Sequence, residues 1–144
     1  MKVYLDNCCF NRPFDDQSQI RIKLEAEAKL FIQDSVRDGR LQLVWSYILD
    51  YENSVNPFEE RRTAIDAWKS QSAVDIVETP KILDDAARLS STGIKPKDAL
   101  HVACAIDAAC EYFLTTDDFL LRKASEVSEI KIVDPPTFVR EVKL

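Results

Sequence analysis

The chain has 144 residues, which is the length of one ordinary domain and enough to bury a core without disulfides or a structural metal. Apolar residues make up 46% and charged residues 31%, so we expect a globular protein, and no apolar run is long enough to predict a membrane span. The net charge of −6 argues against general binding of nucleic-acid phosphates, so action on nucleic acid would need locally placed cations such as metal ions.

Glycine and cysteine usage exclude several classes of site. The chain has only two glycines and contains neither GxGxxG nor a Walker A motif, which excludes the standard nucleotide-phosphate loops. Its four cysteines, Cys8, Cys9, Cys104 and Cys110, lack zinc-site spacing, and His101 is the only histidine. We therefore expect reduced, mostly buried thiols in a cytoplasmic protein.

Apolar runs and helically spaced segments alternate along the chain. In chain order we predict a strand at 3–5, a loop at 7–18, a helix at 20–38, a strand at 41–45, helices at 46–57 and 58–70, a strand at 74–77, helices at 80–89 and 99–109, a strand at 112–116, a helix at 119–124, a strand at 130–133 and a tail at 137–143 that pairs or packs. This alternation predicts an α/β fold, a three-layer α/β/α sandwich with a central, mostly parallel sheet. No linker or repeat interrupts it, so residues 1–144 are expected to form a single domain.

Four acidic residues fall where an open parallel sheet places its ligands, outside the carboxyl ends of the strands. Asp6 ends the first strand, Glu52 lies in the helix after the second, Asp98 opens the helix before the fourth, and Asp117 follows the fourth. Clustered carboxylates repel one another, and a divalent cation such as Mg²⁺ neutralises them. Singly, each has an ordinary alternative: a helix-dipole partner for Asp98, a solvated helix face for Glu52, and a helix cap for Asp117 or Asp118.

Four motifs in this order resemble the PIN domain family, and within it the small bacterial VapC-type toxins and their orphan relatives. They are Val3-Tyr-Leu-Asp6, Ser46-x-x-Leu49-x-x-Glu52, Asp98-Ala-Leu-His-Val-Ala-Cys-Ala105 and Leu114-Thr-Thr-Asp117-Asp-Phe-Leu. The resemblance runs from Val3 to Val133 and implies a Rossmann-like sandwich with an acidic pocket.

The resemblance further implies an endoribonuclease that hydrolyses RNA phosphodiester bonds with Mg²⁺ or Mn²⁺. It places Asp6, Glu52, Asp98 and Asp117 at the catalytic positions. Asp6, Asp98 and Asp117 would hold the metal directly or through water, and Glu52 would be a further ligand or would orient the attacking water. The chain departs from the family pattern in the polar segment that begins at Asn7 and in the Asp117–Asp118 pair, of which either could be the ligand.

Other residues near the expected site have candidate roles. Asn7, Arg12 and Asp118 are candidate substrate-binding residues, and Arg12 could contact RNA phosphates, as could Lys97, Arg122 and Lys123. Asn7 could also hydrogen-bond to a neighbouring carboxylate. His101 shares a helical face with Asp98, but its apolar neighbours favour a packed or hydrogen-bonded structural histidine. Trp45 and Trp68 are expected in the core or at a subunit contact.

The expected partners are RNA, an antitoxin protein and a second copy of the chain, the last through apolar residues around Phe58, Ile65 and Trp68. An alternative is a catalytically silent PIN-like domain that binds RNA or a protein, which the unusual segment after Asp6 motivates. A phosphoacceptor receiver domain is disfavoured, because Asp6 stands without an acidic neighbour and no lysine ends the last strand.

Overall fold

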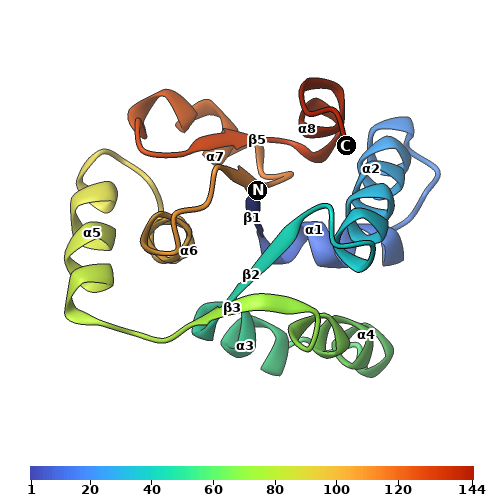
Figure 1. The fold of residues 1–144 in the computed structure, drawn as a ribbon, viewed down its shortest axis with the longest axis horizontal. Helices are drawn as coiled ribbons and strands as arrows, with labels where there is room; N and C mark the ends of the chain where they lie inside the picture. The colour runs from blue at the N-terminus through green and yellow to red at the C-terminus, as the bar shows by residue number, and fades with distance from the viewer.

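A computed structural model describes residues 1–144 and contains one five-stranded sheet (Figure 1). The strands are β1 (Lys2–Leu5), β2 (Gln42–Ser46), β3 (Ser72–Ile76), β4 (Tyr112–Leu114) and β5 (Lys131–Val133). They lie in the order β3-β2-β1-β4-β5, and every neighbouring pair is parallel. The register pairs Tyr4 with Val44 on one side and with Phe113 on the other.

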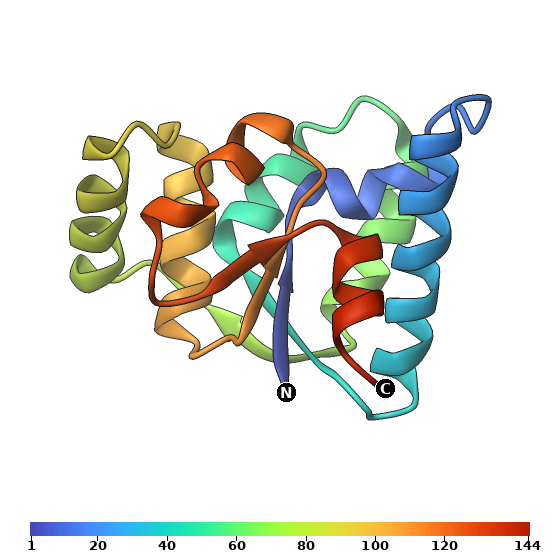
Figure 2. The ribbon, with the colours of Figure 1, turned by 90° about the horizontal axis from the view of Figure 1, so that it is seen from above.

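Helices cover both faces of this sheet. They are α1 (Asn7–Asn11), α2 (Ile20–Arg37), α3 (Tyr47–Ser54), α4 (Glu59–Lys69), α5 (Pro80–Ser91), α6 (Pro96–Asp107), α7 (Asp118–Arg122) and α8 (Pro135–Glu141). Figures 1 and 2 show α5 and α6 together on one side of the strands, and α2 with α8 on the other. The predicted α/β/α sandwich with a parallel sheet is confirmed. No helix combines the length and apolar character that crossing a membrane requires.

The strand order places a topological switch at β1. The chain runs outward from β1 to β2 and β3, then crosses back over β1 to β4 and continues outward to β5. The connections on the two sides of β1 therefore leave on opposite faces of the sheet. A crevice forms at such a point, outside the carboxyl end of the strand, and here that end is occupied by Asp6.

The expectation of a loop at residues 7–18 was wrong in its first half. Residues Asn7–Asn11 form α1, and Arg12–Phe14 continue as a 3₁₀ turn. The side chain of Asp6 caps α1 by accepting a hydrogen bond from the Asn7 backbone N–H, and Cys9 and Phe10 are buried in the core. A five-residue helix is too short to show a helical period in the sequence, so the pattern could not reveal it.

The C-terminal tail packs as a helix. Asp134 accepts a hydrogen bond from the Thr137 N–H at 2.7 Å, Pro135 occupies the first turn of α8, and Phe138 is fully buried. The helix lies against α2 on the same face of the sheet. The tail predicted to pair or pack therefore packs, from two residues earlier than expected.

The core is one cluster of 31 buried residues around the strands, and it includes both tryptophans. Trp45 is fully buried and donates its Nε1–H to Asp50 at 2.9 Å, and Trp68 is also buried. Ile65 belongs to the same core, so only Phe58 is exposed among the three residues expected at a subunit contact. Cys9, Cys104 and Cys110 are buried free thiols, as predicted, and Cys8 is half-buried.

A lysine ammonium lies inside this core without an acidic partner. Lys29 on α2 is 3% exposed, and its Nζ lies 5.1 Å from the centroid of the Phe10 ring and 5.6 Å from that of Trp68. Burial, with a smaller contribution from the nearby charge of Arg37, lowers the pKa of Lys29 to about 7. Because the ammonium keeps its ordinary pKa of 10.5 in the unfolded chain, the unfolded state binds more protons than the folded state between these values.

This proton difference predicts that stability rises with pH above neutrality. Lys29→Met keeps the length of the side chain and removes the charge, so the variant should have a higher free energy of unfolding than the wild type at pH 7. The difference in the free energy of unfolding between the two proteins should narrow toward pH 9 by up to about 1.4 kcal/mol per pH unit. Urea unfolding of both proteins at several pH values measures this, and parallel pH profiles would contradict it.

Candidate active site

Asp6 is fixed at the carboxyl end of β1 by hydrogen bonds to both of its carboxylate oxygens. Oδ1 accepts from the Asn7 backbone N–H at 2.8 Å, and Oδ2 accepts from the Thr115 hydroxyl at 2.9 Å. The Asp6 N–H donates to the Leu114 carbonyl at 2.9 Å. Asp6 is therefore bound to the start of α1 on one side and to the end of β4 on the other.

Thr115 connects Asp6 to the second predicted strand-end carboxylate. Its Oγ1 accepts a hydrogen bond from the Asp117 N–H at 3.1 Å, and the Asp117 side chain caps α7 by accepting from the Phe119 N–H at 2.9 Å. The neighbouring Asp118 points elsewhere and pairs with Arg21 of α2 at 2.7 Å. Of the two adjacent aspartates, Asp117 is the one whose charge acts on Asp98.

Glu52 reaches the site from α3 and hydrogen-bonds to Nε2 of His101, which comes from α6. The other ring nitrogen of His101 bonds to the Tyr4 hydroxyl, which is 2.6 Å from Ser46 Oγ. Tyr4, Ser46 and His101 are all at most 1% exposed. This buried chain of polar groups fixes the direction in which the Glu52 carboxylate points.

Asp98 lies in the first turn of α6, where the charges of the other three predicted acids act on it. Burial, and after it the charges of Asp6, Asp117 and Glu52, together raise the pKa of Asp98 to about 6. Only His101 acts in the opposite direction. The structure thus brings the four predicted acidic residues, which come from distant segments, into one electrostatically coupled group.

His101 is the buried, hydrogen-bonded histidine that the sequence indicated, and the structure places it against the acidic group. Its ligand atom and those of Asp6 and Glu52 lie within 4.8 Å of one another, and its Nε2 is 3.8 Å from Asp6 Oδ1. Burial disfavours the imidazolium, but the hydrogen bond that Nε2 donates to Glu52 and the charges of Asp6, Glu52 and Asp98 raise the pKa of His101. Its position one turn after Asp98 indicated the shared helical face, but the sequence held no signal for its contact with Glu52.

Two of the three candidate substrate-binding residues are engaged in ion pairs within the chain. Arg12 binds Glu25 and Asp15, each at 3.1 Å, so its guanidinium is not free as predicted for an RNA phosphate. Asp118 is held by Arg21. Asn7 donates to the neighbouring Asp6 carboxylate through its backbone N–H, not through its side chain, and its side-chain amide remains at the site.

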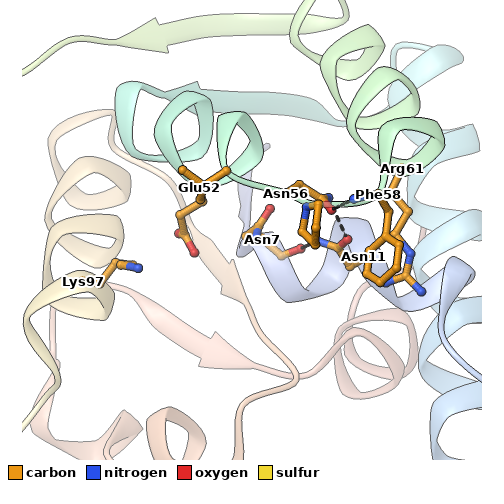
Figure 3. Close-up of a pocket in the computed structure, with 9 residues that line it drawn as sticks. Asn7, Asn11, Glu52, Asn56, Phe58, Arg61 and Lys97 are labelled. Carbon is orange, nitrogen blue, oxygen red and sulfur yellow. Dashed lines mark hydrogen bonds between the residues drawn. The ribbon is translucent and has the colours of Figure 1, made fainter.

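A cavity of about 330 Å³ opens beside Glu52 and Asn7. Its lining comes from α1, from the end of α3 with the connection to α4, and from α4 and α6: Asn7, Asn11, Glu52, Val55, Asn56, Pro57, Phe58, Arg61 and Lys97. Figure 3 shows Lys97 on one side of Glu52 and Asn7 on the other, with Phe58 and Arg61 beyond Asn56. The acidic group therefore borders a polar hollow large enough for part of a nucleotide.

The PIN domain family matches residues 3–126, so this chain belongs to that family. PIN domains are generally nucleases. A chain of VapBC2 from Rickettsia felis, in a structure with a DNA fragment from the promoter of the pair, has a similar fold, with a TM-score of 0.57 and 14% sequence identity. The match covers 92% of this chain and 97% of that one. None of the curated proteins matches the chain.

The hydroxyl of Tyr4 is predicted to stabilise the fold through the buried chain of polar groups. Tyr4→Phe removes a partner of His101 Nδ1 and of Ser46 Oγ without changing the ring that stacks on Phe113, so the free energy of unfolding should fall by about 1–3 kcal/mol. Urea unfolding measures the loss. Tyr51→Phe is the matched control. Because Tyr51 is 59% exposed, this substitution should lower the free energy of unfolding by no more than about 0.5 kcal/mol. Equal losses in the two variants would contradict the prediction.

Proposed function

We propose that the chain is a metal-dependent endoribonuclease that hydrolyses RNA phosphodiester bonds at the Asp6, Glu52, Asp98 and Asp117 group. The observation that carries the proposal is the convergence of these acids on Asp98, whose pKa the surrounding carboxylates and burial raise to about 6. A fold gains nothing in stability from such repulsion, which a bound cation would relieve. Membership of a family that generally cleaves nucleic acid supports the same function.

The donor set fits Mg²⁺ or Mn²⁺. The groups that meet at the site offer carboxylate oxygens, the ligands that hard divalent cations prefer, and the neighbouring cavity leaves room for substrate phosphate. Asp6, Asp98 and Asp117 would hold the cation directly or through water. The hydrogen bonds that fix Asp6 leave it little freedom to turn, so it would act as a preformed ligand.

A bound cation of this kind lowers the pKa of water and stabilises charge on a transferring phosphoryl group. The residues of the chain itself would position the attacking water and the substrate. Glu52, held by His101, would orient the attacking water or provide a further oxygen ligand, and the Tyr4 hydroxyl keeps the imidazole in the required direction. Lys97 lies exposed at the edge of the cavity without an acidic partner and would contact a substrate phosphate.

We further propose that the chain is the toxin of a type II toxin–antitoxin pair, with an antitoxin protein as its partner. The similarity in fold to a chain of the VapBC2 structure and membership of the PIN family support this role. A cytoplasmic location and a homodimer remain predictions. The alternative, a catalytically silent domain, was motivated by an irregular segment after Asp6, and that segment is the ordered helix α1 that Asp6 caps.

The decisive variant is Asp98→Asn, which removes one charge from the acidic group and keeps its shape. Cleavage of labelled single-stranded RNA in Mn²⁺ should fall at least about 100-fold, because the cation loses a ligand. In the absence of metal the melting temperature of the variant should rise above that of the wild type, because the repulsion around residue 98 is removed. Mn²⁺ should raise the melting temperature of the wild type far more than that of the variant.

Asp107→Asn is the matched control, because Asp107 lies at the other end of the same helix and pairs with Lys81. It should cleave RNA and respond to Mn²⁺ as the wild type does. Full cleavage by Asp98→Asn would refute the assigned site. RNA binding by the wild type without cleavage in either Mg²⁺ or Mn²⁺ would favour the catalytically silent domain.

A further inference from the structure

The side-chain amide of Asn7 has no partner within the chain. Its Oδ1 is buried and accepts no hydrogen bond, and its Nδ2 donates none. The other two asparagines of the cavity are occupied: Asn56 donates to Asn11 Oδ1 at 3.3 Å and accepts from the Phe58 N–H at 3.1 Å, while Asn11 donates to the Asn7 carbonyl at 3.1 Å. Asn7 therefore lines the cavity with an amide whose Nδ2 is free to donate and whose buried Oδ1 lacks a partner (Figure 3).

An aromatic ring lies exposed on the same cavity. Phe58 is 56% exposed at the start of α4, although most aromatic residues of the chain are buried or half-buried. The guanidinium of Arg61 lies over this ring at 4.5 Å from its centroid. Arg61 is itself held by Asp15 Oδ1 at 3.0 Å and by the Phe14 carbonyl at 2.8 Å, so its guanidinium is fixed in place over one face of the ring.

These two features fit an unpaired nucleobase. A base has hydrogen-bond donors and acceptors side by side on its edge, which an amide can pair with, and a flat face that stacks on aromatic rings and guanidinium planes. Base-paired strands hide that edge and that face. A phosphate alone would not use an exposed phenylalanine, and an apolar ligand would leave the buried Asn7 Oδ1 without a partner.

We infer that the cavity is a subsite for one unpaired nucleobase of single-stranded RNA, which stacks on Phe58 and hydrogen-bonds to the Asn7 amide beside the acidic group. This inference rests on the proposed nuclease function, because it places the base next to the phosphate that the acidic group would cleave. Figure 3 shows the order that such a strand would meet: Lys97, then Glu52, then Asn7, then Phe58. The subsite makes single-stranded RNA the substrate class and excludes a continuous duplex.

The test measures binding separately from cleavage. Fluorescence anisotropy gives the Kd of the protein for labelled RNAs of about ten nucleotides in Ca²⁺, a hard cation that also takes oxygen ligands, with a gel to show that the RNA stays intact. The RNAs are one intact strand, its duplex, and a series in which a single abasic nucleotide moves along the strand.

The proteins are the wild type, Asn7→Ala, Phe58→Ala and Phe58→Trp, with Phe31→Ala as the matched control. Phe31 is also an exposed phenylalanine with an arginine, Arg40, over its ring, but it lies on α2.

Phe58→Ala and Asn7→Ala should each weaken binding of the intact strand about 5- to 100-fold, whereas Phe58→Trp and Phe31→Ala should bind as the wild type does. The duplex should bind more weakly than the strand. At one position of the series, the abasic nucleotide should weaken binding to the wild type by a similar factor. At that position it should not weaken binding to the Phe58→Ala variant any further, because the two changes remove the same contact. Additive effects at every position, or a Phe58→Ala variant that binds normally, would overturn the subsite.

The two proposals fail in different ways. Coupling between Phe58 and one abasic position, with no cleavage in Mg²⁺ or Mn²⁺, would establish the subsite and refute the nuclease. Cleavage that depends on Asp98 but not on Phe58 or Asn7 would establish the nuclease and refute the subsite.

Discussion

The arrangement of the site depends on the Asp6 carboxylate at the end of β1. One of its oxygens starts α1 through the Asn7 N–H, and the other binds the Thr115 hydroxyl after β4. Thr115 in turn positions Asp117. Because the connections diverge at β1, the segments that carry Glu52 and Asp98 approach the same strand end from different sides of the sheet. The Asp6 side chain thus joins the end of β1 to the start of α1 and, through Thr115, to Asp117.

Two electrostatic effects oppose each other around the Asp98 carboxylate. Asp98 is half-buried among like charges, which makes its ionised form costly, while the imidazole of His101 attracts the same charges. His101 cannot relieve the whole repulsion, because Glu52 and Tyr4 occupy its two nitrogens. The acidic group is therefore a region where stability is given up, and the buried core and parallel ladders maintain the fold around it.

The sequence was sufficient to predict the alternation of strands and helices, because apolar runs such as residues 112–114 and helix starts such as Pro80 are local signals. The acids could be placed together because parallel strands end at one edge. Contacts between distant side chains could not be predicted. Nothing near Arg12 in the sequence shows that its guanidinium turns to Glu25, and the five residues of α1 are too few to show a helical period.

The charge balance and the site together constrain how this chain could hold a polyanion. Arg12, Arg21 and Arg61 are engaged in ion pairs with the chain's own carboxylates, whereas Lys97 at the cavity has no acidic partner. Protein cations strengthen nucleic-acid binding by releasing counterions from the phosphates, and cations that are already paired contribute less to this effect. Under the proposed function, affinity would come from a bound cation and from contacts that carry no charge. The unpaired Asn7 amide and the exposed Phe58 ring would be contacts of that kind, and for this reason the inferred subsite would recognise the base of an RNA strand rather than its backbone.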